Sequence, residues 1–216
     1  MLTMMEEVVL LALDEQTGKL QSAQGFNTGY ALAGAVFFDL ALAKKIDTDV
    51  DTVQLLDPTP TGDAALDFCL SEMTKRPEKT TVRAWIEDLM GYQEFLEDSA
   101  LKSLIARGIL RHETVKRLWI IDVDRFPVVN NKPLQHVKLR LVEAILSDTI
   151  PETRDIMLVS VAEASGLLGV VLSQHELDGR QERVQLLCGL ETISRVVFAA
   201  IRELDLHIRS AAMTSY

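Results

Sequence analysis

The stretch YALAGAVFFDLALAKKI, residues Tyr30–Ile46, decides the class of fold. Asp39 is its only charged residue before the closing lysine pair, and the run as far as Ala43 is otherwise apolar, glycine or tyrosine. This run has 14 residues, whereas a helix needs about 20 apolar residues to cross a bilayer. Its small side chains let neighbouring helices approach closely, while its larger ones fill a core. We therefore expect a central buried helix over Tyr30–Ala43, with Gly34 at a close contact between helices.

The rest of the sequence is typical of one mainly helical domain covering residues 1–216. The chain is 48% hydrophobic and 25% charged, and it is long enough to bury one sizeable core. A capping box, Thr3-x-x-Glu6, predicts a helix from about Met4 to near Gly18. The other expected elements are helices over 64–73 (capped by Asp63), 82–90 (capped by Thr80 or Thr81), 94–108, 134–148, 152–172 and 182–204, and an irregular, proline-containing link over 47–63.

A change of periodicity after the helix predicted over 94–108 indicates a β-hairpin. Two short apolar runs, Leu118–Ile121 and Phe126–Val129, flank the polar sequence Asp-Val-Asp-Arg, so we expect the hairpin over residues 118–130. Trp119 and Phe126 are large apolar residues in this short segment. A two-stranded hairpin is marginally stable alone in water, and its unpaired edges favour a partner. We therefore expect it to project and to contact a membrane or a second copy of the chain.

The charge of the chain is unevenly distributed. The net charge is −10, which repels nucleic acid and anionic lipid from the molecule as a whole. Residues 102–140, however, include nine basic side chains against three acidic ones, a local charge of +6. This segment is either a solvated basic face or a surface that meets an anionic partner. The residues that we assign to this basic surface are Arg111, Lys116 and Arg117.

The sequence contains no motif of an enzyme, a cofactor site or a metal site. Its four histidines are scattered, and Cys69 and Cys188 lack the spacing of a zinc site or a disulfide framework. It has no G-x-S-x-G, P-loop or G-x-G-x-x-G motif. Acidic residues interrupt the apolar pattern at the start of the chain, unlike a secretion signal, so we expect a cytosolic protein. We predict no catalytic residue, no metal ligand and no cofactor.

A helix followed by Gly-Ile-Leu and a two-stranded ribbon is also the pattern of a winged-helix DNA reader. In that interpretation Arg117 and Arg125 lie on the ribbon. The chain outside residues 102–140 has a charge of −16, which opposes DNA. We therefore treat nucleic acid as the less favoured partner.

Seven segments occur in a characteristic order and spacing: LTMMEEVVLLAL (2–13), ALAGAVFFDLALAKKI (31–46), PTGDAALDFCL (60–70), AWIEDLMG (84–91), LKSLIARGIL (101–110), DRFPVVNN (124–131) and IMLVSVAEASGLL (156–168). Together they resemble the Golgi phosphoprotein 3 family, and the resemblance covers nearly the whole chain. It implies a mainly α fold: a multi-helix globular domain with a central helical bundle and a protruding β-hairpin. It also implies a shortened, bacterial relative that begins directly at its first helix.

Members of that family studied in eukaryotes are peripheral membrane proteins that hold phosphatidylinositol 4-phosphate in a basic pocket and act as adaptors for Golgi glycosyltransferases. The resemblance places the tryptophan and the three arginines of that pocket at Gln24, Ala33, Glu94 and Glu97, so none of the four residue types is kept. Two arginines three residues apart on a helix can clamp one phosphate, whereas Glu94 and Glu97 would present two like charges to it. The resemblance therefore implies a degenerate lipid pocket in this chain.

In the family the hairpin is apolar at its tip, which implies that Arg125, Phe126, Pro127 and Val128 lie at the tip here and act with Trp119. An apolar wedge flanked by cations suits an anionic membrane interface. We expect a non-enzymatic peripheral membrane or adaptor-type module, cytoplasmic or on the cytosolic membrane face. Its expected partners are an anionic membrane or phosphoinositide-like anion, a second copy of the chain, or protein clients. One alternative is that Phe126 and Val128 pack back on the body. A separate alternative for the function is a soluble oligomerising protein-interaction module without lipid binding.

Overall fold

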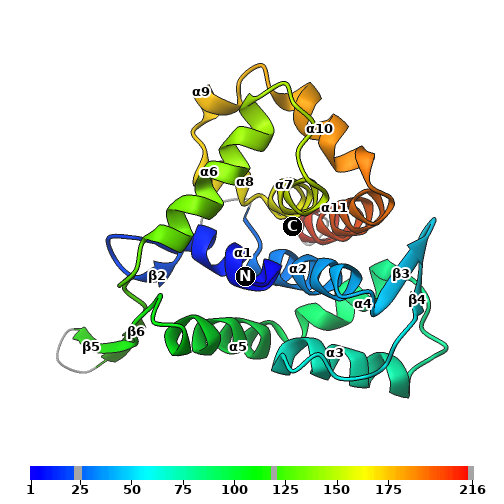
Figure 1. Cartoon of the computed structure of the whole chain (residues 1–216), viewed down its shortest axis with the longest axis horizontal. Coiled ribbons are helices and arrows are strands. Elements are labelled where there is room, and N and C mark those ends of the chain that lie inside the picture. Colours follow the sequence, from blue (N-terminus) through cyan, green and yellow to red (C-terminus); the bar gives the residue numbers. More distant parts are fainter. Residues whose placement is uncertain (22–25, 118–120, 214–216) are drawn as a thin grey trace.

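The computed structural model of the chain describes residues 1–21, 26–117 and 121–213, with the backbone alone described at 117, 121, 208, 209 and 211–213. Helices dominate these ranges and confirm the predicted mainly α fold (Figure 1). The elements are α1 (Met4–Ala12), β1 (Leu13–Asp14), β2 (Lys19–Leu20), α2 (Thr28–Leu42), β3 (Ile46–Asp49), β4 (Thr52–Leu55), α3 (Ala64–Lys75), α4 (Val82–Met90), α5 (Gln93–Ala106), β5 (Glu113–Arg117), β6 (Ile121–Arg125), α6 (Lys132–Leu146), α7 (Thr153–Ser165), α8 (Leu168–Val171), α9 (Gln174–Leu177), α10 (Gln181–Leu190) and α11 (Thr192–Met213).

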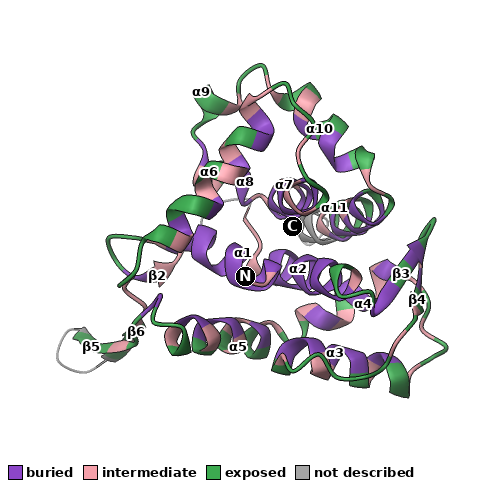
Figure 2. Ribbon diagram, in the orientation of Figure 1, coloured by how far each residue is buried: buried purple, intermediate pink, exposed green. Residues whose placement is uncertain are grey.

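Helices α1 and α2 lie at the centre of the molecule. Every residue of α1 is buried, and in α2 burial extends from Gly29 to Leu40 (Figure 2). Helix α2 packs against α1, α4, α7 and α11. At Gly34, a Cβ atom would lie 2.9 Å from Val161 Cγ2 and 3.1 Å from Ile201 Cδ1, so the helices approach closely because this residue has no side chain. The predicted central helix and its close contact at Gly34 are confirmed.

The start of the first helix is also as predicted. Thr3 Oγ1 accepts a hydrogen bond from Glu6 N at 3.1 Å, and the Glu6 carboxylate accepts one from Thr3 N at 2.7 Å. Asp63 caps α3 and Thr81 caps α4 by accepting from backbone N–H groups of the first turn, without the reciprocal bond. These three helices begin where their local capping residues predict.

The end of the first helix was predicted wrongly. Helix α1 stops at Ala12 rather than near Gly18. Asp14 Oδ1 accepts hydrogen bonds from Gln16 N at 2.9 Å and Thr17 N at 2.8 Å, and this turn replaces the next turn of helix. Gly18 has a φ of 66° and leads the chain into the short β1–β2 hairpin.

The link predicted over 47–63 was wrong in its first half, because strands β3 and β4 form a second hairpin there. Ile46 and Val53 are buried against the helices, which favours this strand pair over an irregular link. Pro58 and Pro60 follow β4 and therefore do not interrupt it. Val50 forms the turn with a φ of 55°, a strained conformation for a β-branched residue.

Two long apolar helices predicted near the end of the chain are each interrupted. The first breaks at Gly166, which has a φ of 82° and separates α7 from α8. The second breaks at Glu191, where α10 and α11 meet with a bend of 117°. Within the described ranges, no single helix is long and apolar enough to cross a membrane; α10 and α11 pass that test only as a bent pair.

The β5–β6 hairpin is present, but its predicted position was wrong. The strands pair antiparallel with Glu113 opposite Arg125 and Arg117 opposite Ile121, so the hairpin covers 113–125 rather than 118–130. The sequence Asp-Val-Asp-Arg, which we expected to be the turn, forms strand β6 instead. Opposite charges face each other across the strands, as at Glu113 and Arg125, and such pairs stabilise this register.

Candidate functional site

The residues expected at the hairpin tip do not lie there. Phe126 and Val128 are half-buried and pack against the core, and Phe126 N donates a hydrogen bond of 2.5 Å to Gly18 O. Pro127, also half-buried, lies between them. The alternative in which Phe126 and Val128 pack back on the body is therefore confirmed. Trp119 lies outside the described residues.

A polar cluster fixes the base of the hairpin. His112 Nε2 lies 2.9 Å from Asp124 Oδ1, and the hydrogen bond from His112 holds the pKa of Asp124 below its usual value. The His112 ring also stacks on Phe126, with 5.4 Å between ring centroids. Arg125 faces Glu113, and its Nε is buried without a hydrogen-bond partner in the described part of the chain. Arg125 thus belongs to the base of the hairpin and not to its tip.

Beyond this base, the hairpin projects from the helices (Figure 1). In the described ranges, β5 and β6 pair with each other and with no third strand. Thr114, Val115, Lys116 and Asp122 are exposed along it. The hairpin therefore offers two unpaired strand edges and both apolar and charged side chains to a partner.

Ion pairs neutralise much of the positive charge of the basic segment 102–140. The carboxylates in these pairs lie either outside the segment or within it. Among the described side chains of this segment, Lys116, Arg125 and Lys132 have no ion-pair partner, and the side chain of Arg117 lies outside the described part. The basic residues that form ion pairs with carboxylates are Lys102, Arg107, Arg111, Lys138 and Arg140. The basic surface is accordingly smaller than the local charge of +6 implies.

The positions that correspond to the family lipid pocket lie around the starts of α2 and α5, except for Gln24, which is outside the described residues. Ala33 is fully buried, Glu94 is exposed and Glu97 is half-buried. Burial, opposed by a hydrogen bond from Gln93 and assisted by the charge of Glu94, raises the pKa of Glu97. A Cβ atom at Gly29 would lie 2.8 Å from Gln93 Oε1, so the first turns of the two helices are in contact.

More negative charge surrounds the start of α2. Burial raises the pKa of Tyr30, and the charges of Asp205 and Glu87 raise it further. The surroundings of this helix start thus include carboxylates from α4, α5 and α11. Such an environment is unfavourable for a phosphate group.

Two adjacent carboxylates of α1 are buried and face different neighbours. Glu6 is 1% exposed and Glu7 is 2% exposed. Glu6 accepts hydrogen bonds of 2.6 Å from both Ser103 Oγ and Arg107 Nη1 of the α5 region. Glu7 is bound by arginines from α6 and α7 instead. A buried charge is tolerated when it is paired and hydrogen-bonded, so this central helix is joined to both sides of the molecule by ion pairs.

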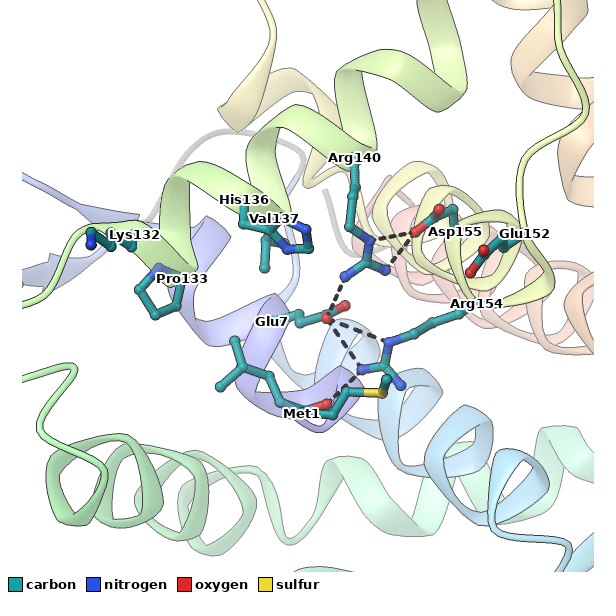
Figure 3. A pocket seen from close by; sticks show the side chains of 11 residues that line it. Met1, Glu7, Lys132, Pro133, His136, Val137, Arg140, Glu152, Arg154 and Asp155 are labelled. Atoms are coloured by element: carbon teal, nitrogen blue, oxygen red, sulfur yellow. Dashed lines mark hydrogen bonds and ion pairs between the residues drawn. The ribbon is translucent and has the colours of Figure 1, made fainter.

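A cavity of about 600 Å³ lies beside Glu7, between α1, α6 and α7 (Figure 3). Glu7 Oε1 lies 2.7 Å from Arg140 Nη1 and 3.2 Å from Arg154 Nη2. Arg140 Nε donates a bond of 2.8 Å to Asp155 Oδ1. Burial alone would lower the pKa of Arg140, but its bonds to Glu7 and Asp155 raise it, so the guanidinium stays charged. The cavity is lined by Met1, Leu2, Glu7, Lys132, Pro133, His136, Val137, Arg140, Glu152, Arg154 and Asp155.

Sequence reasoning missed this cluster because acidic residues are abundant in the chain. One local signal was available: Glu6 and Glu7 lie in a helix that has no polar face, so they had to be buried with it. Their partners could not be identified in this way, since Arg140 and Arg154 lie on other helices. Among the described residues, no group of three His, Cys, Asp or Glu side chains could hold a metal ion.

These features define a mainly helical domain with a buried central helix pair and a projecting hairpin. The sequence matches the Golgi phosphoprotein 3 (GPP34) family over residues 4–204, and the chain belongs to this family. It is similar to vacuolar protein sorting-associated protein 74 of Eremothecium gossypii, with 28% identity over 214 residues, covering 83% of this chain and 64% of that protein. The protein of the same name from Schizosaccharomyces pombe is 30% identical over 171 residues, covering 69% of this chain and 50% of the relative.

The chain therefore spans about half to two thirds of the length of these curated relatives. Both relatives are fungal, and they lend no support to the expected bacterial origin. The name of these relatives refers to vacuolar protein sorting, a trafficking process.

Proposed function

We propose that this chain is a non-enzymatic peripheral membrane or adaptor-type module that acts on the cytosolic side of a membrane through its β5–β6 hairpin. The observation that supports this proposal is that the hairpin projects from the helices and, in the described ranges, leaves both outer strand edges unpaired. Unpaired backbone N–H and C=O groups favour association with another chain, and exposed apolar side chains favour burial in a partner. Membership of the Golgi phosphoprotein 3 family is consistent with this role.

Because the register of the hairpin differs from the predicted one, the residues that we propose to make the contacts differ as well. Phe126 and Val128 would have to leave the core to enter a membrane, so they are not proposed as inserting residues. The proposed contacts come from β5, β6 and residues 118–120, whose sequence is Leu-Trp-Ile and includes Trp119. Lys116 and Arg117 precede this apolar sequence, and each cation near an anionic bilayer surface contributes about 1 kcal/mol.

The decisive experiment replaces residues 118–120 with Gly-Asn-Gly, which leaves the pair Arg117 and Ile121 to close the hairpin. A matched control is Val50→Asn, because Val50 is an exposed apolar residue at the turn of the β3–β4 hairpin. We expect the replacement, and not the control, to reduce flotation on anionic vesicles or the mass measured by light scattering. If the replacement leaves both properties unchanged, the hairpin does not carry the function.

Salt dependence distinguishes the two partners. Association with anionic lipid falls as salt rises through the physiological range, whereas hydrophobic self-association is nearly independent of salt. A soluble oligomer without lipid binding would therefore keep its mass at high salt and stay unbound to vesicles. The winged-helix alternative is less well supported, because Arg125 lies at the hairpin base with its Nε buried.

We also propose that the family lipid pocket does not bind phosphatidylinositol 4-phosphate in this chain. Support comes from Glu94 and Glu97 at the start of α5 and from Ala33, which is fully buried and leaves no room for an arginine. We expect no saturable binding of the soluble headgroup at micromolar concentration. Saturation of the parent protein in that range, with an affinity that rises in Glu94→Gln or Glu97→Gln and so places the headgroup at this pocket, would overturn the proposal.

A further inference from the structure

Two arginines in the cavity between α1, α6 and α7 are held in place by carboxylates. Glu7 is buried, lies between the two guanidinium groups and accepts from both, and Asp155 accepts from Arg140 (Figure 3). Arg154 Nη2 also donates a bond of 2.8 Å to Leu2 O. Guanidinium groups that are already fixed lose little side-chain freedom when they bind a ligand.

The same cavity has hydrogen-bond donors that are still open. Arg154 Nη1 has no partner among the described residues, and in Figure 3 it points away from Glu7. Lys132 and His136, from the first two turns of α6, are exposed and have neither an ion-pair nor a hydrogen-bond partner through their side chains in the described ranges. The start of α7 also lines this cavity, and the Glu152 side chain does not cap it, although Asp155 in the first turn offsets the positive end of that helix dipole.

We infer that this cavity binds the phosphate monoester of a small ligand, either free in solution or as a lipid headgroup. A phosphate monoester has three acceptor oxygens, which suit the open Nη1 group of the Arg154 guanidinium assisted by the ammonium group of Lys132. The volume of about 600 Å³ is sufficient for a small phosphorylated molecule. The site is separate from the hairpin and from the family pocket positions, so its test does not depend on the proposed function.

Acidic residues at this cavity oppose an anion and make the inference testable. Glu7 Oε1 and Asp155 are engaged with the arginines, whereas Glu7 Oε2 is buried without a hydrogen-bond partner in the described part of the chain. Glu152 is exposed and, in the same ranges, forms no ion pair or cap. Glu152→Gln removes one repelling charge next to Arg154 without removing a contact. Glu143→Gln on α6 makes the same charge change at an exposed residue that does not line the cavity.

The experiment titrates the full chain with glycerol 3-phosphate at millimolar concentrations and measures binding by calorimetry or by shifts of amide signals. We expect Glu152→Gln to tighten binding roughly threefold to tenfold, as expected for removing one like charge near the ligand, and Glu143→Gln to leave it unchanged. Arg154→Gln should abolish binding. Arg154→Gln also leaves Glu7 with fewer partners, so a loss of binding in that variant can come from misfolding. The tighter binding expected for Glu152→Gln is the test that does not depend on the folding of Arg154→Gln.

A second arm identifies the source of the phosphate. Vesicles that contain phosphatidic acid, a phosphate monoester, are compared with vesicles of equal charge that contain phosphatidylserine, a diester. Preference for phosphatidic acid that increases in Glu152→Gln identifies a lipid headgroup, whereas the same increase with glycerol 3-phosphate alone identifies a free ligand. If neither probe binds saturably, or if Glu152→Gln and Glu143→Gln affect binding equally, the inference is wrong.

Discussion

Replacing Gly34 with leucine should destabilise the protein by overpacking its centre. Even the Cβ atom of alanine would lie 2.9 Å from Val161 Cγ2, 3.1 Å from Ile201 Cδ1 and 3.3 Å from Val197 Cγ1. Favourable carbon contacts begin at about 3.5 Å, so three side chains on two helices would have to move. Overpacking costs about 1–3 kcal/mol, while removing a glycine from a helix interior gains about 1 kcal/mol. We therefore expect Gly34→Ala to cost about 1 kcal/mol and Gly34→Leu about 3 kcal/mol or more.

The matched control is Gly189→Ala in α10. Gly189 is exposed, and no heavy atom lies within 4 Å of a Cβ atom built there, so this variant should gain about 0.5–1 kcal/mol from helix propensity alone. The assay is thermal and denaturant unfolding. A loss of 3 kcal/mol corresponds to a fall in melting temperature of about 6–12 °C for a domain of this size. A Gly34→Leu variant that melts within a degree or two of the parent would show that α2 does not pack against α7 and α11 as described.

Two further predictions concern the buried charges. Burial raises the pKa of Asp39 from 3.8 to about 7, although Asp39 accepts from Met4 N and Met5 N. The pKa of Asp39 is higher in the folded than in the unfolded state, so the free energy of unfolding should fall by about 4 kcal/mol as pH rises from about 4 to above 7. Asp39→Asn should flatten this dependence in denaturant unfolding at several pH values. An equal slope in both proteins would contradict the prediction. Arg107→Leu should cost about 2–4 kcal/mol because it leaves Glu6 buried without its cation; denaturant unfolding measures this, and a change below 0.5 kcal/mol, the usual range for a surface substitution, would show that the pair contributes little.

Signals that act over a few residues were sufficient to predict the helical class and most helix starts. The capping box of Thr3 and Glu6 and the cap at Asp63 depend on side chains that reach their own first turn. The apolar run of α2 also required burial wherever it was placed, because it offers no polar face to water. The position of Gly34 among small side chains was enough to predict a close helix contact there.

Contacts between distant parts of the chain decided the rest. Residues 122–125 can form either a turn or a strand; they became β6 because Phe126 and Val128 pack on the core beside Gly18, which sets where the hairpin leaves the body. The cavity cluster depends on such contacts even more strongly. Glu7 lies 133 residues along the chain from Arg140 and 147 from Arg154, and no local pattern links them. A buried carboxylate must find a cation, but packing of the helices determines which one.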